Sequence, residues 1–294
     1  MTTYRTLDVD GLDLFVREAG SADAEALVLL PGFPSSSAQY EGLLARLSHR
    51  LRLIAPDYPG FGHSSTPPVE AFDYTFDRLA ELTERLLLDV LGLERFWLYV
   101  FDFGAPIGLR IAERHPGRIA GLIVQNGNAY EAGLGPQMDL QKAFAANRAG
   151  VEPQIRELLT LDVTRAQYFD GAGDPARIDP DAPLLDQHLM DQPHRKDAFV
   201  ELLYDYQTNV ARYPAWQAYL RDHRPPTLIA WGANDRFFTA DGARAYLADL
   251  PDAELHLLDS GHFALAEHPD EIADLIAAFT ERHSDRSGEA MRAA

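Results

Sequence analysis

The 294-residue sequence contains no cysteine, which excludes disulfide bridges, thiolate zinc sites, iron–sulfur clusters and a cysteine nucleophile. Basic residues are also scarce, because 26 Lys and Arg stand against 45 Asp and Glu and give a formal net charge of −19. A charge of this sign repels phosphate backbones and anionic membrane surfaces. We therefore expect no nucleic acid and no membrane as a partner. The charge indicates solubility, and it leaves the oligomeric state open.

Long apolar runs are absent as well. The longest have the length of strands, well below the ~18 residues that a membrane helix needs. The N-terminal segment lacks a basic start followed by an apolar stretch, so we expect no signal peptide and a cytoplasmic protein. A chain of this length is one large domain, or one domain with an inserted subdomain, and it can bury roughly 75% of its unfolded surface.

Short apolar runs alternate with longer helical patterns along most of the chain. Buried strands are predicted over residues 26–30, 51–55, 96–101, 119–124, 227–231 and 254–258. Helices are predicted over residues 76–91, 104–115, 240–250 and 270–282. This alternation is typical of an α/β fold with a mostly parallel central sheet flanked by helices.

The rhythm breaks between residues 125 and 224. This segment is polar, helix-prone and rich in proline, and it has no convincing strand pattern. It therefore predicts an insertion placed on top of the sheet. Insertions at the carboxyl ends of parallel strands lie where open α/β sheets bind ligands.

Three polar residues each follow a predicted strand: Asp102, Asp235 and His262. Taken singly, an Asp after a strand is more often a helix cap, and a His is more often a surface residue. Together they have the chain order nucleophile, acid, histidine, which is the order of α/β-hydrolases. We therefore interpret them as a catalytic triad.

The neighbours of Asp102 indicate the kind of turn that it occupies. A nucleophile at a sharp strand-to-helix turn needs small residues two positions before and after it. Gly104 fits this pattern, whereas Val100 is larger than usual at its position. No serine lies nearby to compete for the role.

An aspartate nucleophile implies a particular chemistry. A carboxylate is ordinarily ionised at neutral pH, so its attack needs no base. Attack on an ester carbonyl would give an easily reversed anhydride, whereas attack on a saturated carbon gives a stable alkyl-enzyme ester. His262 would then act as general base on water, and Asp235 would orient the imidazole.

These features resemble the aspartate-nucleophile branch of the α/β-hydrolase superfamily, which contains epoxide hydrolases and haloalkane or haloacetate dehalogenases. The resemblance covers residues 27–279 and rests on motifs at residues 31–34, 57–62 and 102–108, on Asp235 and on His262. It implies an α/β-hydrolase fold with a core domain over residues 1–127 and 225–294 and a helical cap (lid) over residues 128–224.

The resemblance also implies an oxyanion hole. In the family the first loop begins with His, where this chain has Pro31. The backbone N–H groups of Phe33 and Phe103 would form the oxyanion hole, and backbone donors survive a change of the neighbouring side chain.

Residue 103 bears on the choice of substrate. Haloalkane dehalogenases of this branch usually have Trp directly after the nucleophile, and haloacetate dehalogenases have Arg, whereas this chain has Phe103. Epoxide hydrolases use two lid tyrosines as donors to the ring oxygen. Tyr168 and Tyr206 resemble these two, and Tyr204 is the rival of Tyr206. We therefore expect hydrolysis of a small, neutral, mostly apolar epoxide to a vicinal diol, with water and without cofactor or metal.

Other functions stay open. The same triad could dehalogenate a haloalkane or a haloacid. An ester or lactone hydrolase would instead use His262 to activate water directly. An inert, ligand-binding scaffold would result if Val100 prevents the turn. We expect Asp57 and the acidic residues near 170–181 to lie in solvated loops rather than to serve as ligands.

Overall fold

The structure is a computed structural model that describes residues 1–292, with side chains described as far as Ser284. Its strands form one eight-stranded sheet in the order β1-β2-β4-β3-β5-β6-β7-β8. The strands are β1 (Thr3–Val9), β2 (Leu12–Ala19), β3 (Ala26–Leu30), β4 (Arg52–Pro56), β5 (Phe96–Phe101), β6 (Ile119–Gln125), β7 (Thr227–Gly232) and β8 (Glu254–Leu258). β2 pairs antiparallel with β1 and β4, and all other neighbours are parallel. The predicted α/β fold with a mostly parallel sheet is confirmed.

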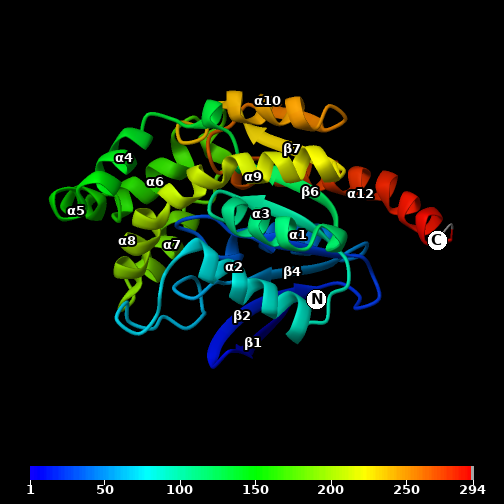
Figure 1. The fold of residues 1–294 in the computed structure, drawn as a ribbon, viewed down its shortest axis with the longest axis horizontal. Coiled ribbons are helices and arrows are strands. Elements are labelled where there is room, and N and C mark those ends of the chain that lie inside the picture. Colours follow the sequence, from blue (N-terminus) through cyan, green and yellow to red (C-terminus); the bar gives the residue numbers. More distant parts are fainter. Residues whose placement is uncertain (293–294) are drawn as a thin grey trace.

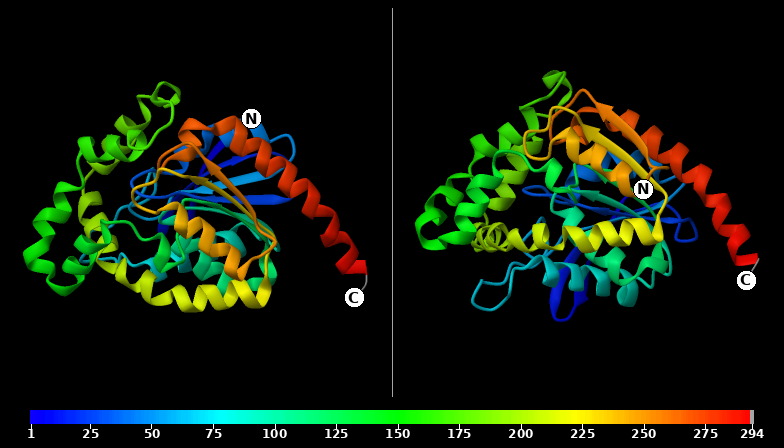
Figure 2. Two further views of the ribbon diagram at one scale, coloured as in Figure 1. Left: turned by 90° about the horizontal axis from the view of Figure 1, so that it is seen from above. Right: turned by 45° about the horizontal axis from the view of Figure 1, so that its top comes forward.

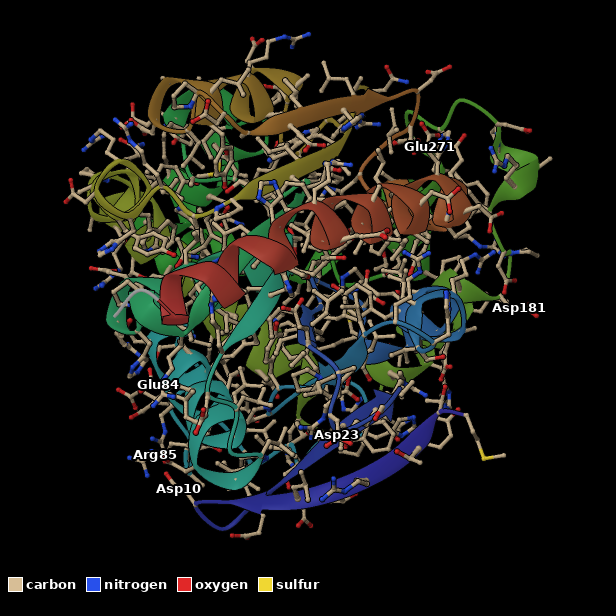
Figure 3. The ribbon with its side chains drawn as sticks, turned by 90° about the vertical axis from the view of Figure 1, so that its right-hand side faces the viewer. Asp10, Asp23, Glu84, Arg85, Asp181 and Glu271 are labelled. Atoms are coloured by element: carbon tan, nitrogen blue, oxygen red, sulfur yellow. The ribbon has the colours of Figure 1, made fainter. Side chains whose placement is uncertain are left out.

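The hairpin of β1 and β2 is the part of the sheet that the search for apolar runs missed. β1 is mostly exposed at the sheet edge and therefore has no apolar run. The turn contains Asp10 and Gly11 with φ of 56° and 81°, and Asp-Gly is a strong hairpin signal. Arg85 contacts Asp10 at 2.6 Å and ties the turn to the next layer; the two side chains lie together in Figure 3.

Helices cover both faces of the sheet, as the view from above in Figure 2 shows. One face carries α1 (Glu41–Leu47), α11 (Ala264–Glu267) and α12 (Pro269–Arg292), and the other carries α2 (Phe76–Arg85), α3 (Gly104–Arg114) and α10 (Ala240–Asp249). Short helical turns are η1 (Ser37–Tyr40), η2 (Leu86–Val90), η3 (Pro116–Arg118), η4 (Glu131–Gly133) and η5 (Pro175–Arg177).

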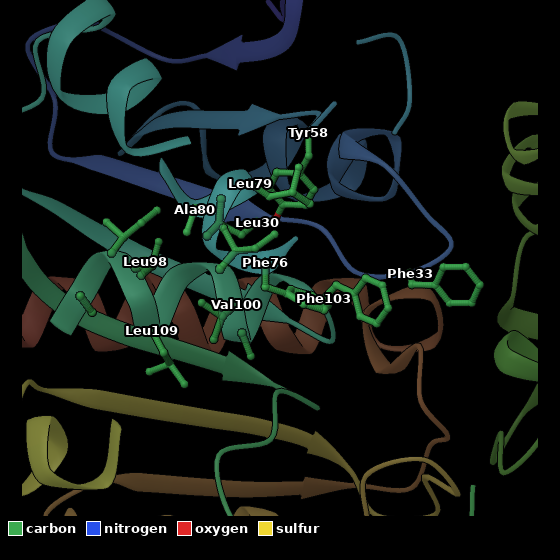
Figure 4. Packing of buried hydrophobic residues seen from close by; sticks show 14 of the residues in the cluster. Leu30, Phe33, Tyr58, Phe76, Leu79, Ala80, Leu98, Val100, Phe103 and Leu109 are labelled. Atoms are coloured by element: carbon green, nitrogen blue, oxygen red, sulfur yellow. The ribbon is translucent and has the colours of Figure 1, made fainter. Parts of the chain in front are cut away.

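The central strand β5 contributes to both cores because its side chains alternate between the faces. Leu98 and Val100 pack with the α2 and α3 side, whereas Trp97 and Tyr99 pack with the α1 and α12 side. Figure 4 shows the first of these clusters, with Phe33 and Phe103 at the end that approaches the inserted helices. The hydrophobic core therefore extends to the carboxyl end of β5.

The chain between β6 and β7 contains helices and no strand among its described residues. The helices are α4 (Met138–Ala146), α5 (Arg148–Glu157), α6 (Leu161–Phe169), α7 (Ala182–Met190), α8 (Arg195–Asp205) and α9 (Gln207–His223). Figure 1 shows α4 to α8 gathered at one end of the sheet, whereas α9 runs back alongside α3. The structure therefore contains the predicted insertion without strands. That the insertion forms a cap separate from the core stays a prediction.

Helix ends follow the local sequence with one correction. Thr75 caps α2, since its Oγ1 accepts a hydrogen bond from the N–H of Arg78 at 3.1 Å. The last helix was expected to end near Arg282, but it continues to Arg292, because no proline interrupts this stretch. None of the helices in the described part of the chain combines the length and the apolar character that crossing a membrane requires.

The start of α3 is pressed against the backbone of β3, and this contact generates a first prediction. A Cβ at Gly104 would lie 2.3 Å from the carbonyl oxygen of Leu30. We expect Gly104→Ala to lower the free energy of unfolding by about 2 kcal/mol or more, because backbone atoms cannot move aside cheaply. Urea denaturation followed by circular dichroism measures the change.

The matched control is Gly117→Ala, where a Cβ would meet no atom within 4 Å. Its free energy of unfolding should stay within about 0.5 kcal/mol of the parent. Equal effects of the two substitutions would contradict the steric argument.

Candidate active site

Asp102 occupies the turn between β5 and α3 in a left-handed backbone conformation. Its φ is +48° and the residue is buried. Such a conformation costs about 1–3 kcal/mol in a residue other than glycine and persists only where the surroundings enforce it. A Cβ at Gly32 would lie 2.4 Å from the Cβ of Asp102, so the first loop closes tightly over this side chain.

Val100 does not prevent this turn. A Cβ at Gly108 would lie 2.6 Å from Cγ1 of Val100. The missing side chain of Gly108, one helical turn beyond Gly104, therefore leaves the space that Val100 occupies. A pattern centred on the turn itself does not reveal this compensation.

The two oxygens of the Asp102 carboxylate have different surroundings. Oδ1 accepts a hydrogen bond from the backbone N–H of Phe33 at 2.6 Å. Oδ2 lies 3.6 Å from Nε2 of His262. The N–H of Phe103 makes no hydrogen bond with any residue that the structure describes, and its role as an oxyanion donor stays a prediction.

His262 and Asp235 lie side by side although they follow different strands. Nδ1 of His262 lies 2.7 Å from Oδ2 of Asp235, and both residues are buried. A Cβ at Gly232 would lie 1.8 Å from the carbonyl oxygen of Gly261, so the loops after β7 and β8 touch at a glycine. The structure thus brings Asp102, His262 and Asp235 into one chain of contacts, and their catalytic roles stay proposals.

Asn126 is a site residue that the sequence analysis does not single out. Its Nδ2 donates to Oδ2 of Asp235 at 2.7 Å, and its Oδ1 accepts the N–H of Gly232 at 2.9 Å. Asp235 also accepts the N–H of Phe237 at 2.7 Å. Asn126 therefore holds the carboxylate that faces His262. Its place directly after β6, the strand beside β7, is the signal that could have found it.

The charge of His262 depends on its two carboxylate neighbours. Burial by itself lowers the pKa of His262, because the imidazolium loses its hydration, but the charges and hydrogen bonds of Asp235 and Asp102 raise it to about 10. The two carboxylates together therefore favour a protonated His262 at neutral pH.

A cavity of about 130 Å³ opens beside Asp102 and His262. Apolar side chains from the loops and from the inserted helices form most of its wall, among them Phe33, Phe103, Phe237, Phe238, Met138, Leu140, Leu158, Val163 and Leu203. Other polar side chains in the wall are Tyr206, Gln137, Gln141 and Gln167. A cavity of this kind fits a small, mostly apolar molecule.

Of the three predicted lid tyrosines, Tyr206 lines this cavity. Its ring packs against Phe103, with centroids 6.0 Å apart. Burial raises the pKa of Tyr206 well above its usual value, and the neighbouring Tyr213 and the charge of Asp102 add to the rise. Tyr206 therefore keeps its proton at the cavity wall, with Tyr213 as a neighbour of its hydroxyl.

Two contacts between the core and the insertion hold the α8–α9 junction that carries Tyr206. The N–H of Phe76 donates to Oδ2 of Asp205 at 2.8 Å. Nη1 of the buried Arg110 donates to Oδ1 of Asn209 at 2.7 Å. The position of Tyr206 is thus set from the core on both sides of the junction.

Tyr168 and Tyr204 do not line the cavity, which corrects their assignment as proton donors. The hydroxyl of Tyr168 donates to Oδ2 of Asp186 at 2.6 Å, and its ring stacks on Phe263 with centroids 3.9 Å apart. Tyr204 packs against Phe144. Tyr168 follows Gln167 by one position on α6, about 100° around the helix, so its side chain faces away from the cavity that Gln167 lines.

Asp186 joins the insertion to the core below the first loop. Besides the Tyr168 hydroxyl, it accepts a hydrogen bond from Oγ of Ser35 at 3.1 Å. Burial raises the pKa of Asp186 to about 7, although both hydrogen bonds act to lower it. This carboxyl is therefore a titrating group in contact with elements that carry the site.

Asp57 is another correction, because it is buried rather than solvated. Oδ1 accepts the N–H of Ser37 at 2.7 Å, and Oδ2 accepts the N–H of His63 at 2.8 Å. Its side chain organises two loops at the end of the sheet. The sequence shows only a polar residue among turn residues and does not reveal these donors.

None of the three tryptophans of the sequence is among the residues that line the cavity. Trp97 and Trp231 lie in strands, Trp216 lies in α9, and all three are buried. The N–H of Trp231 donates to the carbonyl of Phe238 at 3.0 Å. An indole N–H is therefore not available at the cavity wall.

Comparison with known proteins places these features in context. Residues 25–269 match the sequence profile of the family described as alpha/beta hydrolase fold. An uncharacterized hydrolase of Saccharomyces cerevisiae is 41% identical over 278 residues, which cover 92% of this chain and 95% of the yeast protein.

Two solved structures are similar in fold. The epoxide hydrolase CorEH has a TM-score of 0.79 at 18% identity, covering 96% of this chain and 99% of its own. The haloalkane dehalogenase DatA from Agrobacterium tumefaciens has a TM-score of 0.79 at 22% identity, covering 96% and 97%.

The two carboxylates beside His262 generate a prediction on its titration. Asp102→Asn removes one of the negative charges that raise the pKa of His262 from its usual 6.5 to about 10. We expect the pKa to fall by roughly 1–3 units, the usual effect of one close charge. NMR titration of the imidazole resonances, assigned through their loss in His262→Gln, measures it.

Asp186→Asn is the matched control, because Asp186 is not among the groups that shift His262. It should leave the pKa of His262 in place. An unchanged pKa in Asp102→Asn would contradict the proposed coupling between nucleophile and base.

Asp186 generates a prediction on stability. Its pKa is raised from 3.8 to about 7, so the folded chain binds this proton more tightly than the unfolded chain. This group's contribution to the free energy of unfolding therefore falls as the pH rises from about 4 to 7. Asp186→Asn removes that dependence, and the stability difference between parent and variant should change by more than about 1 kcal/mol.

Urea denaturation at pH 4.5 and pH 8 measures this difference. The same substitution at Asp181, which is exposed, should give a difference that does not depend on pH in this way. A parallel pH dependence of parent and Asp186→Asn would show that Asp186 does not titrate between these values.

Proposed function

This chain belongs to the alpha/beta hydrolase fold family, and we propose that it is a hydrolase in which Asp102 attacks a saturated carbon and forms an alkyl-enzyme ester. We further propose that the substrate is a small, mostly apolar epoxide, which leaves as a vicinal diol. Residues 128–224 act in this proposal as a cap over the core formed by residues 1–127 and 225–294.

The observation that carries the proposal is that the two carboxylate oxygens of Asp102 have different contacts. Oδ1 is engaged by the N–H of Phe33 at 2.6 Å, whereas Oδ2 is directed toward His262 Nε2 at 3.6 Å and toward the cavity. A carboxylate held in this way has one oxygen free to form a bond. The other already lies in the place where negative charge develops when the ester is hydrolysed.

In the first step Oδ2 of Asp102 forms a bond to a ring carbon, and the carbon–oxygen bond of the epoxide breaks. The ring oxygen takes the proton of the Tyr206 hydroxyl. Tyr206 suits this role because it lines the cavity and because its hydroxyl carries a proton at neutral pH.

In the second step the electrostatics of His262 change. Asp102 loses its negative charge on becoming an ester, so one of the two causes that raise the pKa of His262 disappears. The Nε2 proton passes to the Tyr206 phenolate and restores its hydroxyl. The neutral imidazole then accepts a proton from water, whose oxygen attacks Cγ of Asp102. The ester bond breaks, the leaving oxygen takes that proton from His262 so that the diol departs, and the new carboxyl group of Asp102 returns its own proton to His262.

Epoxide opening is favoured over dehalogenation by the donors at the cavity. The haloalkane dehalogenases that this chain resembles usually hold the departing halide with a Trp directly after the nucleophile, and none of the three tryptophans lines this cavity. Phe103 supplies no side-chain donor after the nucleophile. The Tyr206 hydroxyl is the kind of donor that an epoxide oxygen needs.

The test traps the ester. We expect His262→Gln, treated with styrene oxide, to gain the mass of one substrate molecule, because removing a general base slows hydrolysis by about 10²–10⁴-fold. Asp102→Asn should gain no mass under the same conditions. Intact-protein mass spectrometry measures both.

Three outcomes would point elsewhere. Bromide release from 1-bromobutane, with no diol from styrene oxide, would favour dehalogenation by the same triad. Ester or lactone turnover that survives in Asp102→Asn would favour direct activation of water by His262. Retained ligand binding with no adduct in any variant would favour an inert scaffold.

A further inference from the structure

Helix α6 presents two different faces to its surroundings. Thr164 and Tyr168, four positions apart, face away from the cavity: Thr164 donates to Oε1 of Gln187 at 3.0 Å, and Tyr168 donates to Asp186. Val163 and Gln167 are also four positions apart, and they line the cavity. Residues at this spacing lie on one face of a helix. The residue that α6 offers to the cavity is therefore Gln167.

The carboxamide of Gln167 has no partner within the described chain. The residue is 5% exposed, and its side chain makes no hydrogen bond with any described residue. Its amide atoms are not among the fully buried polar atoms that lack a partner, so they reach the cavity space, where water or a ligand atom can bond them. A polar group with free donors in the same cavity wall as Asp102 indicates a contact with the substrate.

The other two glutamines of the cavity wall differ from Gln167. Nε2 of Gln137 donates to the carbonyl oxygen of Phe237 at 2.5 Å, so this amide is engaged by the protein. Gln141 is only partly buried. Of the three glutamines in the cavity wall, Gln167 is thus the buried one whose amide N–H groups are free to bind a ligand.

We infer that Nε2 of Gln167 is the second hydrogen-bond donor to the oxygen that leaves the reacting carbon, beside the hydroxyl of Tyr206. This inference rests on the proposed epoxide hydrolysis. Tyr206 comes from the α8–α9 junction and Gln167 from α6, so the two donors reach one cavity from different helices.

The chemistry assigns unequal roles to the two donors. As Oδ2 of Asp102 bonds to the ring carbon and the ring bond breaks, negative charge gathers on the ring oxygen. Tyr206 transfers its proton to that oxygen. Gln167 donates a hydrogen bond and keeps its proton, because an amide is far too weak an acid to release it. It therefore stabilises the charge before the proton arrives.

The test separates ring opening from ester hydrolysis. In single-turnover mixing with styrene oxide, we expect Gln167→Leu to form the ester about tenfold or more slowly than the parent, the effect of losing one hydrogen bond. The rate at which the ester is hydrolysed should change less than twofold, because Gln167 has finished its role by then. A general weakening of the cap would slow both steps.

Two further variants sharpen the result. Gln187→Leu is the matched control, since Gln187 is buried in the neighbouring helix and contacts Thr164 and Asp191 outside the cavity. It should lower thermal stability and leave ring opening unchanged. Gln167→Glu should open the ring slowly at high pH and recover as the pH falls, because only the protonated carboxyl donates.

The outcomes distinguish this inference from the function on which it rests. An ester that forms in Gln167→Leu as fast as in the parent would overturn the role of Gln167 alone. The absence of any ester from styrene oxide in His262→Gln would overturn the epoxide activity and the donor role together. Equal slowing of both steps in Gln167→Leu would assign the residue to cap packing and overturn its donor role.

Discussion

The carboxylate of Asp102 is held out of bulk water by contacts that leave one of its oxygens free, and the arrangement of the site depends on this. A buried anion is costly unless hydrogen bonds and opposite charge compensate it. Here the N–H of Phe33 engages Oδ1, and the imidazole of His262 lies on the side of Oδ2. The strained turn at φ +48° places the side chain between these groups, and the glycines around it allow that approach.

The same contacts couple the nucleophile to the base. His262 lies between two carboxylates, and their joint effect outweighs the burial that would otherwise discharge it. Asp235 is itself fixed by the amide of Asn126 and the N–H of Phe237. When one carboxylate of the pair becomes a neutral ester, the balance around His262 changes without any movement of the chain. The proposed mechanism thus uses the loss of charge in its first step to prepare the second.

The inserted helices contribute to the cavity wall through the direction of a few side chains. Of the polar groups on α6 and at the α8–α9 junction, Gln167 and Tyr206 face the cavity, whereas Tyr168 faces Asp186. The junction is tied to the core through Asp205 and Asn209. One face of these helices therefore lines the cavity, and another face attaches the insertion to the core.

The sequence by itself determined the parallel sheet and the positions of Asp102, Asp235 and His262 after three strands, whereas the donor at Phe33 came from the family resemblance. These depend on local patterns, since an apolar run followed by a turn marks a strand end wherever the strand packs. The search for apolar runs did not reveal the edge strand β1, which is mostly exposed, or its neighbour β2, and it did not reveal the buried state of Asp57. Only the tertiary structure decided that Asn126 holds Asp235 and that Gln167 rather than Tyr168 meets the cavity. The first of these contacts joins segments that are far apart in the chain. The second depends on helix rotation, since one position along a helix, about 100°, decides which side chain faces the cavity.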